Sequence, residues 1–502
     1  MAPMHIIIRA EMTRNPVPDR AAASALGGAL RGVGYSQAAV IDVLGDDAYS
    51  IDRDDAPAAE RRLGRDALGS IIRVCFLQLP VLVRDAEGAV GRRGVEALET
   101  IGLATVHRRE LVPRVRILPV GDLLVASDDY PGDEEPPDYV AAYTPTSQLC
   151  ETLTPRPRVA RALDVGTGSG VQALFAARHA QRVVATDVNE RALAYTELNA
   201  ALNDLANIEC RLGSLFEPVV GERFDLITSN APYVISPENR LVYRDAGFEG
   251  DELSQRIVRN AAEHLNDGGF ATLFVSWLAE DEDAPDEHVL SWTDGLGCDS
   301  WILPVWGDDP IGHATTWNEG LESDHAAFVA AVDEWTSYLE RLGARWITEG
   351  IVLLHRRPGG RYTARVDEVE EDDLDNAGDQ IRRAFASRAR LATLGGRDDL
   401  LDTRLSIASA LRLEDELELK GDGPTIATAY IHLDEGTNSS VETDPRVLDV
   451  VAALDGEAPL GEVVQSIADE LNLSDDEVPR LRLESLNVAR ELLELGALQF
   501  SA

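Results

Sequence analysis

The stretch from Ala160 to Asp187, ARALDVGTGSGVQALFAARHAQRVVATD, decides the fold class of this chain. The apolar run ARALDV predicts a buried strand, and VQALFAARHA predicts the helix that follows the glycines. RVVATD then predicts a second buried strand, so the three pieces form a strand–helix–strand unit of the kind that builds parallel sheets. We therefore expect an α/β domain.

The glycine-rich turn between that strand and that helix, residues 164–170, predicts a ligand-binding loop. Alternate glycines let the backbone approach a ligand closely, and their GxGxG spacing differs from the GxGxxG of dinucleotide-binding loops. Without a pyrophosphate to hold, the helix N-terminus is expected to face a carboxylate. Asp187, at the end of the next strand, can accept both hydrogen bonds of a ribose diol. The pattern favours a nucleoside-bearing ligand over a purely structural turn.

Strand and helix patterns continue to alternate through residues 126–360 and predict seven strands in all. The further strands are expected in IECRLG (208–213), FDLITSNAPY (224–233), FATLFVSWL (270–278), DSWILPV (299–305) and ITEGIVLLHRR (347–357), with helices in ERALAYTELNAALND (190–204), SQRIVRNAAEHLNDGG (254–269) and HAAFVAAVDEWTSYLERL (325–342).

Smaller regions flank this domain. Residues 1–19 read as a tail, and residues 20–125 have the helical periodicity of a small helical or winged-helix-like domain. Residues 361–502 predict a second winged-helix-like domain. Two acidic runs, AEDEDAPDEH (279–288) and VDEVEEDDLDNAGD (366–379), are interpreted as solvated segments, the second marking the boundary to the C-terminal domain.

The loop after the fourth strand of the domain, Ser229-Asn230-Ala231-Pro232-Tyr233, is where we expect the chemistry. An amide or exocyclic amine nitrogen attacks poorly because its lone pair is delocalised into a neighbouring π-system. An Asn side-chain oxygen and a backbone carbonyl can each accept one of its N–H bonds, which would orient the lone pair for attack. Tyr233 is placed to stack on such a planar group.

These motifs together resemble class I S-adenosylmethionine-dependent methyltransferases of the release-factor glutamine N5-methyltransferase and Asn-Pro-Pro-Tyr amino-group type. The resemblance covers about residues 140–280 and is carried by DVGTGSG, ATDVNERAL, NAPY and AGFEGDELSQRIVRNAAEHLNDGG. The segment Tyr143-Thr144-Pro145-Thr146 is similar to the Tyr-x-Pro segment that opens the fold in that family. The resemblance implies a Rossmann-like seven-stranded domain, S-adenosyl-L-methionine as cofactor, and N-methylation of a planar amide or amino nitrogen.

The motifs and the resemblance supply the candidate site residues. Ala231 replaces the first proline of the usual loop, although its carbonyl is retained, and Ser214 stands where an acidic residue commonly contacts adenine. The expected catalytic residues are Asn230, Ala231, Pro232 and Tyr233. The expected cofactor-binding residues are Tyr143, Asp164, Gly166, Thr167, Gly168, Gly170, Asp187, Val188, Ser214, Leu215 and Asn230. No metal site is expected, because the nine histidines form no HExxH motif and no Cys/His cluster.

The substrate is less well defined by the sequence. A formal charge of −42 and the absence of a basic cluster disfavour a long nucleic acid, so a protein or peptide substrate with a glutamine-like amide is preferred. An RNA or DNA base (adenine N6 or guanine N2), a small molecule, and a cofactor-binding scaffold remain alternatives. Residues 243–245 (Tyr243, Arg244, Asp245) either close over the substrate or cap the next helix. Five tryptophans read as core or as a substrate lid: Trp277, Trp292, Trp301, Trp306 and Trp317.

The expected location is the cytoplasm. No run of 18 apolar residues predicts a membrane span, and the N-terminus lacks the apolar core and cleavage site of a secretory signal. The four cysteines are scattered, without disulfide or metal spacing, which suits a reducing compartment.

Overall fold

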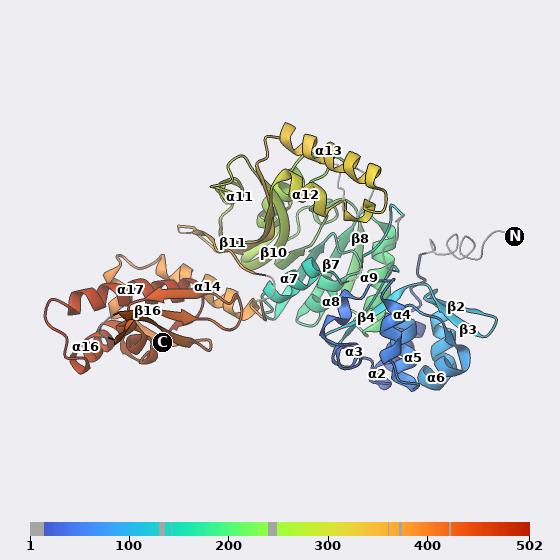
Figure 1. Ribbon diagram of the computed structural model, residues 1–502, viewed down its shortest axis with the longest axis horizontal. Helices are drawn as coiled ribbons and strands as arrows, with labels where there is room; N and C mark the ends of the chain where they lie inside the picture. Colours follow the sequence, from blue (N-terminus) through green and yellow to red (C-terminus); the bar gives the residue numbers. More distant parts are fainter. Residues whose placement is uncertain are drawn as a thin grey trace. The chain divides into compact units, whose positions relative to one another are not determined.

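The computed structural model describes residues 15–129, 136–141, 143–238, 248–359, 361–370, 374–420 and 423–501 (Figure 1). Residues 243–245, which were considered beside the catalytic loop, lie outside these ranges. The chain divides into two compact units. The first comprises Met1–Glu151, Arg158–Asp294 and Trp306–Gly350, and the second comprises Thr152–Pro157, Gly295–Val305 and Ile351–Ala502.

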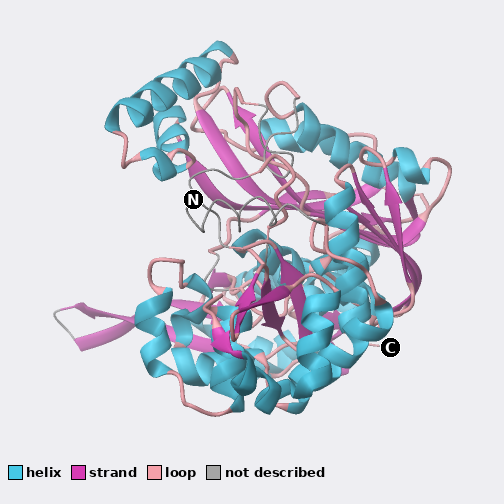
Figure 2. Ribbon diagram, turned by 90° about the vertical axis from the view of Figure 1, so that its right-hand side faces the viewer, coloured by secondary structure: helices cyan, strands magenta, loops and turns pink. Residues whose placement is uncertain are grey.

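The central feature is an eight-stranded sheet with the order β13-β11-β12-β10-β9-β6-β7-β8, whose strands are among those drawn in magenta in Figure 2. Strand β6 pairs in parallel with β7 and β9, β7 with β8, and β9 with β10. The predicted α/β class with a mostly parallel sheet is thereby confirmed. The strands are β6 (Val159–Val165), β7 (Ala180–Asp187), β8 (Ile208–Leu212), β9 (Phe224–Ser229), β10 (Leu265–Ala279), β11 (Cys298–Asp308), β12 (Trp346–Arg356) and β13 (Ala364–Val366).

The strand order places the candidate loops. From β6 the chain builds outward through β7 and β8, then returns to add β9 and β10 on the opposite side of β6. Ligands of open α/β sheets bind where the strand order reverses, beyond the carboxyl ends of the strands. Val165 pairs with Ser229, so the glycine-rich loop and the Asn230 loop leave adjacent strands at the same level.

The sheet has one strand more than the seven predicted. The additional strand, β13, pairs with β11 and begins two residues before the acidic run that was interpreted as the domain boundary. Its three residues, Ala-Arg-Val, are too few to show an alternating pattern. The helix predicted at 254–269 is also too long at its C-terminal end, because α10 ends at His264 and β10 begins at Leu265.

Helices connect these strands. The segment between β11 and β12 is a helical insertion, residues 309–345, in which α12 and α13 lie side by side (Figure 1). The helices of this part of the chain are α7 (Pro145–Leu153), α8 (Val171–Ala177), α9 (Glu190–Leu202), α10 (Glu252–His264), α11 (Glu287–Thr293), α12 (Pro310–Thr316) and α13 (His325–Arg341).

The N-terminal region combines helices with two small antiparallel sheets, β1-β3-β2 and β4-β5. Its hydrophobic core is continuous with residues of α8 and α9. Its elements are α2 (Arg20–Gly32), α3 (Gln37–Leu44), α4 (Ala56–Ala59), α5 (Ala67–Ile71), a π-helical turn (Ile72–Phe76), β1 (Val81–Leu82), α6 (Val83–Thr100), β2 (Ala104–His107), β3 (Glu110–Pro113), β4 (Arg116–Val120) and β5 (Leu123–Ser127).

Two asparagines, Asn199 of α9 and Asn203 directly after it, attach the N-terminal region to the sheet domain. The Asn199 side chain accepts the N–H of Ala126 at 2.7 Å and donates to its carbonyl at 2.8 Å, as a neighbouring strand would. It also donates to the carbonyl of Ser169 in the glycine-rich loop at 2.7 Å. Asn203 makes the corresponding pair of bonds to Leu124 at 2.9 and 2.7 Å. The position of the glycine-rich loop is therefore tied to the N-terminal region.

The second unit contains the C-terminal region. Its elements are α14 (Gly378–Leu391), β14 (Arg404–Ile407), β15 (Arg412–Lys420), β16 (Gly423–His432), β17 (Ser440–Thr443), α15 (Pro445–Ala452), β18 (Asp455–Pro459), α16 (Leu460–Glu470), α17 (Val478–Glu494) and β19 (Leu498–Phe500). They include two antiparallel sheets, β18-β14-β19 and β15-β16-β17. The β15–β16 hairpin and α14 were not predicted; in the hairpin, the first strand is rich in acidic residues.

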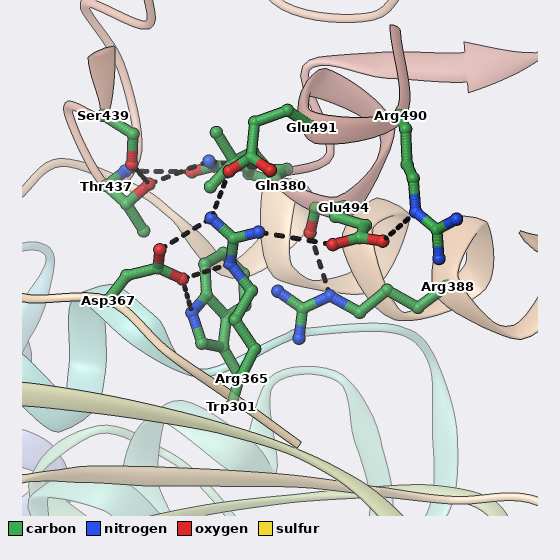
Figure 3. A network of polar contacts seen from close by, with 11 residues as sticks. Trp301, Arg365, Asp367, Gln380, Arg388, Thr437, Ser439, Arg490, Glu491 and Glu494 are labelled. Carbon is green, nitrogen blue, oxygen red and sulfur yellow. Dashed lines mark hydrogen bonds and ion pairs between the residues drawn. The ribbon is translucent and has the colours of Figure 1, made fainter. Parts of the chain in front are cut away.

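A polar network joins elements within this unit (Figure 3). Arg365 of β13 pairs with Asp367 and with two carboxylates of α17, Glu491 at 2.5 Å and Glu494 at 3.4 Å. Asp367 also accepts the indole N–H of Trp301 at 2.7 Å. Arg365 is therefore the residue that links β13 to α17.

We expect Asn199→Ala to destabilise the first unit by about 1–3 kcal/mol, because it leaves buried backbone groups of Ala126 without partners. Chemical denaturation, monitored by a signal from the first unit, would measure this change in the free energy of unfolding. Asn203→Ala is the matched control and should cost less, since its partners at Leu124 lie in a part-buried position. An equal loss in the free energy of unfolding for both variants would contradict a larger structural contribution of Asn199.

Candidate active site

Asp164, at the end of β6, holds the glycine-rich loop against its neighbours. Its carboxylate is 2% exposed and accepts the hydroxyls of Thr167 at 2.7 Å and Thr228 at 2.9 Å and the N–H of Ala173 at 3.1 Å. Burial raises the pKa of Asp164 to about 6. These bonds connect the loop, helix α8 and strand β9, so Asp164 positions the site from inside the protein.

The loop glycines adopt conformations that other residues rarely take. Gly166, Gly168 and Gly170 have φ values of 67°, 55° and 87°. A Cβ on Gly166 would lie 2.9 Å from the Cβ of Ala231, and one on Gly170 would lie 2.9 Å from the side chain of Thr196. Nothing lies within 4 Å of a Cβ built on Gly168. The loop thus packs tightly against the Asn230 loop at one end and is open in its middle.

Asp187 lies at the end of β7, next to this open part. Its carboxylate accepts the N–H of Gly168 at 2.9 Å and that of Asn189 at 2.8 Å, and burial raises its pKa. The following side chain, Val188, is 53% exposed. The Asp187 carboxylate can accept further hydrogen bonds, which suits the hydroxyls of a ribose. The exposed apolar side chain of Val188 suits the flat base attached to that ribose.

The turn after β8 carries local strain. Leu215 has a φ of +48°, which is unusual for a bulky residue and is found mostly where the surroundings enforce it. Its carbonyl accepts the hydroxyl of Thr186 at 3.1 Å, and the carbonyl of Ser214 accepts the N–H of Glu217 at 2.9 Å. Both residues are half-buried, as is Tyr143 before α7.

Asn230 follows β9, and its amide is oriented by two hydroxyls. Its Nδ2 donates to Thr146 Oγ1 at 3.1 Å and to Ser147 Oγ at 3.3 Å. Among the described residues, no donor reaches its Oδ1, which is buried. The Asn230 Nδ2 thus has hydrogen-bond acceptors, whereas its Oδ1 can still accept a hydrogen bond from an external donor.

Ser147 was not among the predicted site residues, and Thr146 was noted only as part of the opening segment. Both lie in the first turn of α7, where the hydroxyl of Thr144 also contacts each of them at 3.0 and 2.9 Å. The run of hydroxyl residues after Tyr143 was the available signal, but only the tertiary structure brings it to Asn230.

The remaining residues of the catalytic loop have distinct surroundings. Ala231 is buried against Gly166, whereas Pro232 and Tyr233 are half-buried. The Tyr233 ring meets Phe274 of β10 at a centroid distance of 4.5 Å and Trp317 at 5.9 Å, both edge to face. Of the five tryptophans, Trp277, Trp292 and Trp301 are buried in the core, while Trp306 and Trp317 belong to the aromatic group around Tyr233.

A buried acid lies next to this aromatic group and was not predicted. Glu349 of β12 is 9% exposed and accepts the indole N–H of Trp317 at 3.2 Å. Burial raises its pKa to about 7, and burial lowers the pKa of the neighbouring His313 to about 4. At neutral pH His313 is therefore uncharged and does not neutralise the glutamate.

The chemistry of these residues suits S-adenosylmethionine. The open glycine loop and Asp187 offer backbone and carboxylate contacts for a nucleoside, and the unpartnered Asn230 oxygen offers an acceptor for an N–H group. Among the described residues, no group of three or more His, Cys, Asp or Glu side chains is arranged to hold a metal ion.

Comparison with known families assigns the class of this domain. Residues 144–279 match the family described as methyltransferase small domain, and residues 32–114 match a domain of unknown function, DUF7059. The resemblance to class I S-adenosylmethionine-dependent methyltransferases is thereby confirmed for the part of the chain that carries the glycine loop, Asp187 and Asn230.

The similar curated proteins are glutamine methyltransferases. The release factor glutamine methyltransferases of Xylella fastidiosa and Geobacter sulfurreducens are 37% and 38% identical over 129 and 134 residues, which is 23% and 24% of this chain and 47% and 46% of those proteins. The ribosomal protein uL3 glutamine methyltransferase of Bradyrhizobium diazoefficiens is 35% identical over 150 residues, 27% of this chain and 47% of that protein. The chain thus spans about half the length of the curated relatives it matches.

Among solved structures, Trm5b from Pyrococcus abyssi aligns with a TM-score of 0.30 and 14% identity, over 53% of this chain and 68% of that chain. A score this low supports no inference. Within the described part of the chain, no helix is both long and apolar enough to cross a membrane.

We expect Glu349→Gln to stabilise the protein at alkaline pH. Because the folded-state pKa of Glu349 is raised from 4.5 to about 7, its stabilising contribution is complete below pH 4.5 and is lost as the pH rises through 7. The variant should therefore match the wild type under acidic conditions and exceed it above pH 7 by up to about 3 kcal/mol.

Chemical denaturation of both proteins across this pH range would measure the difference. The other titrating groups are the same in both proteins, so their contributions cancel in the difference in stability. A variant that is less stable than the wild type at alkaline pH would show that the ionised carboxylate stabilises the fold.

Proposed function

We propose that this protein is an S-adenosylmethionine-dependent N-methyltransferase acting on a planar amide nitrogen, that of a glutamine side chain in a protein or peptide. The observation that carries the proposal is the buried Asn230 Oδ1, which has no hydrogen-bond donor among the described residues. It follows β9, next to the glycine-rich loop after β6. A substrate N–H would satisfy this acceptor, and burying it without one is costly.

The proposed mechanism depends on orientation. Thr146 and Ser147 hold Nδ2 of Asn230, so Oδ1 accepts one substrate N–H and the carbonyl of Ala231 accepts the other. With both hydrogens held, the nitrogen lone pair would be fixed perpendicular to the amide plane. Positioning of this kind can lower a barrier by up to about 7–11 kcal/mol. Tyr233, fixed by Phe274 and Trp317, flanks the planar group.

When bound, S-adenosylmethionine supplies a methyl group on a positively charged sulfur that is already a good leaving group. We assign its ribose to Asp187 and its adenine to the neighbourhood of Val188, Ser214 and Leu215. The loop glycines and Thr167 would lie against its amino-acid portion, with Tyr143 at the edge of the site. Asp164 acts on the cofactor through the loop that it holds.

A protein substrate is favoured by two observations. The similar curated proteins are named for glutamine methylation of release factors and of ribosomal protein uL3. The formal charge of −42 disfavours a long polyanionic substrate. A reducing cytoplasm suits the four cysteines, none of which forms a disulfide.

The flanking regions are proposed to be winged-helix-like domains. Each combines several short helices with a three-stranded antiparallel sheet, β1-β3-β2 in one and β18-β14-β19 in the other. Neither has a marked basic cluster in its sequence, so we assign them to protein contacts. For the N-terminal domain, the contacts of α9 show one such surface within the chain.

Transfer of a labelled methyl group from S-adenosylmethionine into fractionated cell extract tests the proposal. We expect label in protein, lost on the order of 100-fold in Asn230→Ala, because the substrate nitrogen is no longer oriented. Calorimetry should show that the variant still binds the cofactor. Asn15→Ala, at an exposed position, is the control and should retain activity. Label in RNA or small molecules, or no transfer at all, would contradict the proposal.

The double variant Thr146→Val with Ser147→Ala should lower kcat more than it raises KM. It removes the two acceptors of Asn230 Nδ2 and allows the amide to turn, without removing Oδ1. Steady-state kinetics would measure this, with the protein fraction that accepts label from the wild type as the substrate. Unchanged kcat would mean that Asn230 is oriented without these hydroxyls.

A further inference from the structure

The buried carboxylate of Glu349 lacks a countercharge. Within the described residues, Trp317 Nε1 is the one hydrogen-bond donor that reaches it, and no arginine or lysine pairs with it. Buried carboxylates in proteins are normally paired or hydrogen-bonded to several donors, because an isolated buried charge is expensive. The surroundings of Glu349 do not meet that requirement.

His313 presents a further hydrogen-bond acceptor to Glu349 and no donor. Its Nε2 lies 3.1 Å from the carbonyl of Ile235, which can only accept, so the neutral ring carries its proton on Nε2. Its Nδ1 is then an acceptor, and it lies 3.9 Å from Oε1 of Glu349. When Glu349 is ionised, two acceptors therefore face each other, with no donor from the described residues between them. An external N–H group could serve both.

The aromatic side chains nearby fit a cation. Trp317 donates to Glu349 and also contacts Tyr233 of the catalytic loop, so one side chain joins the acid to the proposed reaction site. Phe274 lies against Tyr233 and against Trp306, at centroid distances of 4.5 and 5.8 Å. Aromatic rings close to a carboxylate are an environment that can accommodate a guanidinium or ammonium group.

The insertion between β11 and β12 creates this arrangement. His313 belongs to α12 and Trp317 follows it directly, while Glu349 lies near the start of β12. Trp335 of α13 contacts His313 from another side, with a centroid distance of 6.0 Å. The matched family segment ends at residue 279, so Glu349 and the three tryptophans Trp306, Trp317 and Trp335 lie outside the part shared with that family.

We propose that Glu349, backed by Trp317 and His313, binds a basic side chain of the substrate that lies next to the methylated amide. Glu349 is then a specificity-determining residue, and the preferred substrate is a glutamine flanked by arginine or lysine. The methyl-transfer part of this inference rests on the proposed function, whereas binding of the basic group does not.

Short blocked peptides containing glutamine next to arginine test the proposal, with matched peptides carrying the uncharged isostere citrulline. Calorimetric binding to the full chain is measured first, and methyl transfer second. We expect the wild type to bind the arginine peptides about tenfold or more tightly than the citrulline peptides. Glu349→Gln, which keeps the shape of the side chain, should lose this difference while still binding S-adenosylmethionine.

One control variant separates the contribution of the carboxylate from that of the indole N–H. Trp317→Phe keeps an aromatic ring but removes the indole N–H, and should weaken binding of the arginine peptides less than Glu349→Gln does. Equal binding of the two peptide types by the wild type, no binding of either, or a preference that survives in Glu349→Gln would each overturn the proposal. Charge-selective binding without methyl transfer would support this inference and contradict the proposed function.

Discussion

The carboxylate of Asp164 is the constraint on which the site depends. It sits in the interior with three hydrogen-bond donors from three different elements, the glycine loop, α8 and β9. Those bonds fix the loop after β6 next to the loop after β9, where Gly166 and Ala231 touch. A side chain at Gly166 would push the two loops apart, because its Cβ would lie 2.9 Å from the Cβ of Ala231. The replacement of the family's first proline by Ala231 is compatible with this contact, because Gly166 faces the small Cβ of Ala231.

The orientation of Asn230 follows from the same arrangement. The hydroxyls of Thr146 and Ser147 satisfy the nitrogen of its amide and leave its oxygen unpartnered among the described residues. Ser147 is in turn held through its carbonyl by Gln172 of α8, at 2.8 Å. The helix that follows the glycine loop therefore also supports the residue that would bind the substrate. The glycine-rich loop and the Asn230 loop share one set of contacts.

The parts of the chain outside the shared methyltransferase segment act on this centre in different ways. The N-terminal region reaches the glycine loop through Asn199, which pairs with β5 and with Ser169. The insertion between β11 and β12 places Trp317 against Tyr233 and brings Trp317 and His313 next to Glu349 of β12. The first contact supports the glycine-rich loop, and the second shapes the surroundings of Tyr233.

The sequence by itself determined the parallel α/β domain, the strand–helix alternation and the loops that hold the candidate residues. These features depend on local periodicity and on glycine and asparagine positions that each element carries on its own. Only the tertiary structure decided that Thr146 and Ser147 orient Asn230, that β13 extends the sheet, and that Glu349 lies beside the aromatic group. Residues 146 and 230, or 317 and 349, are far apart along the chain. Their relation exists only through packing, which no local pattern records.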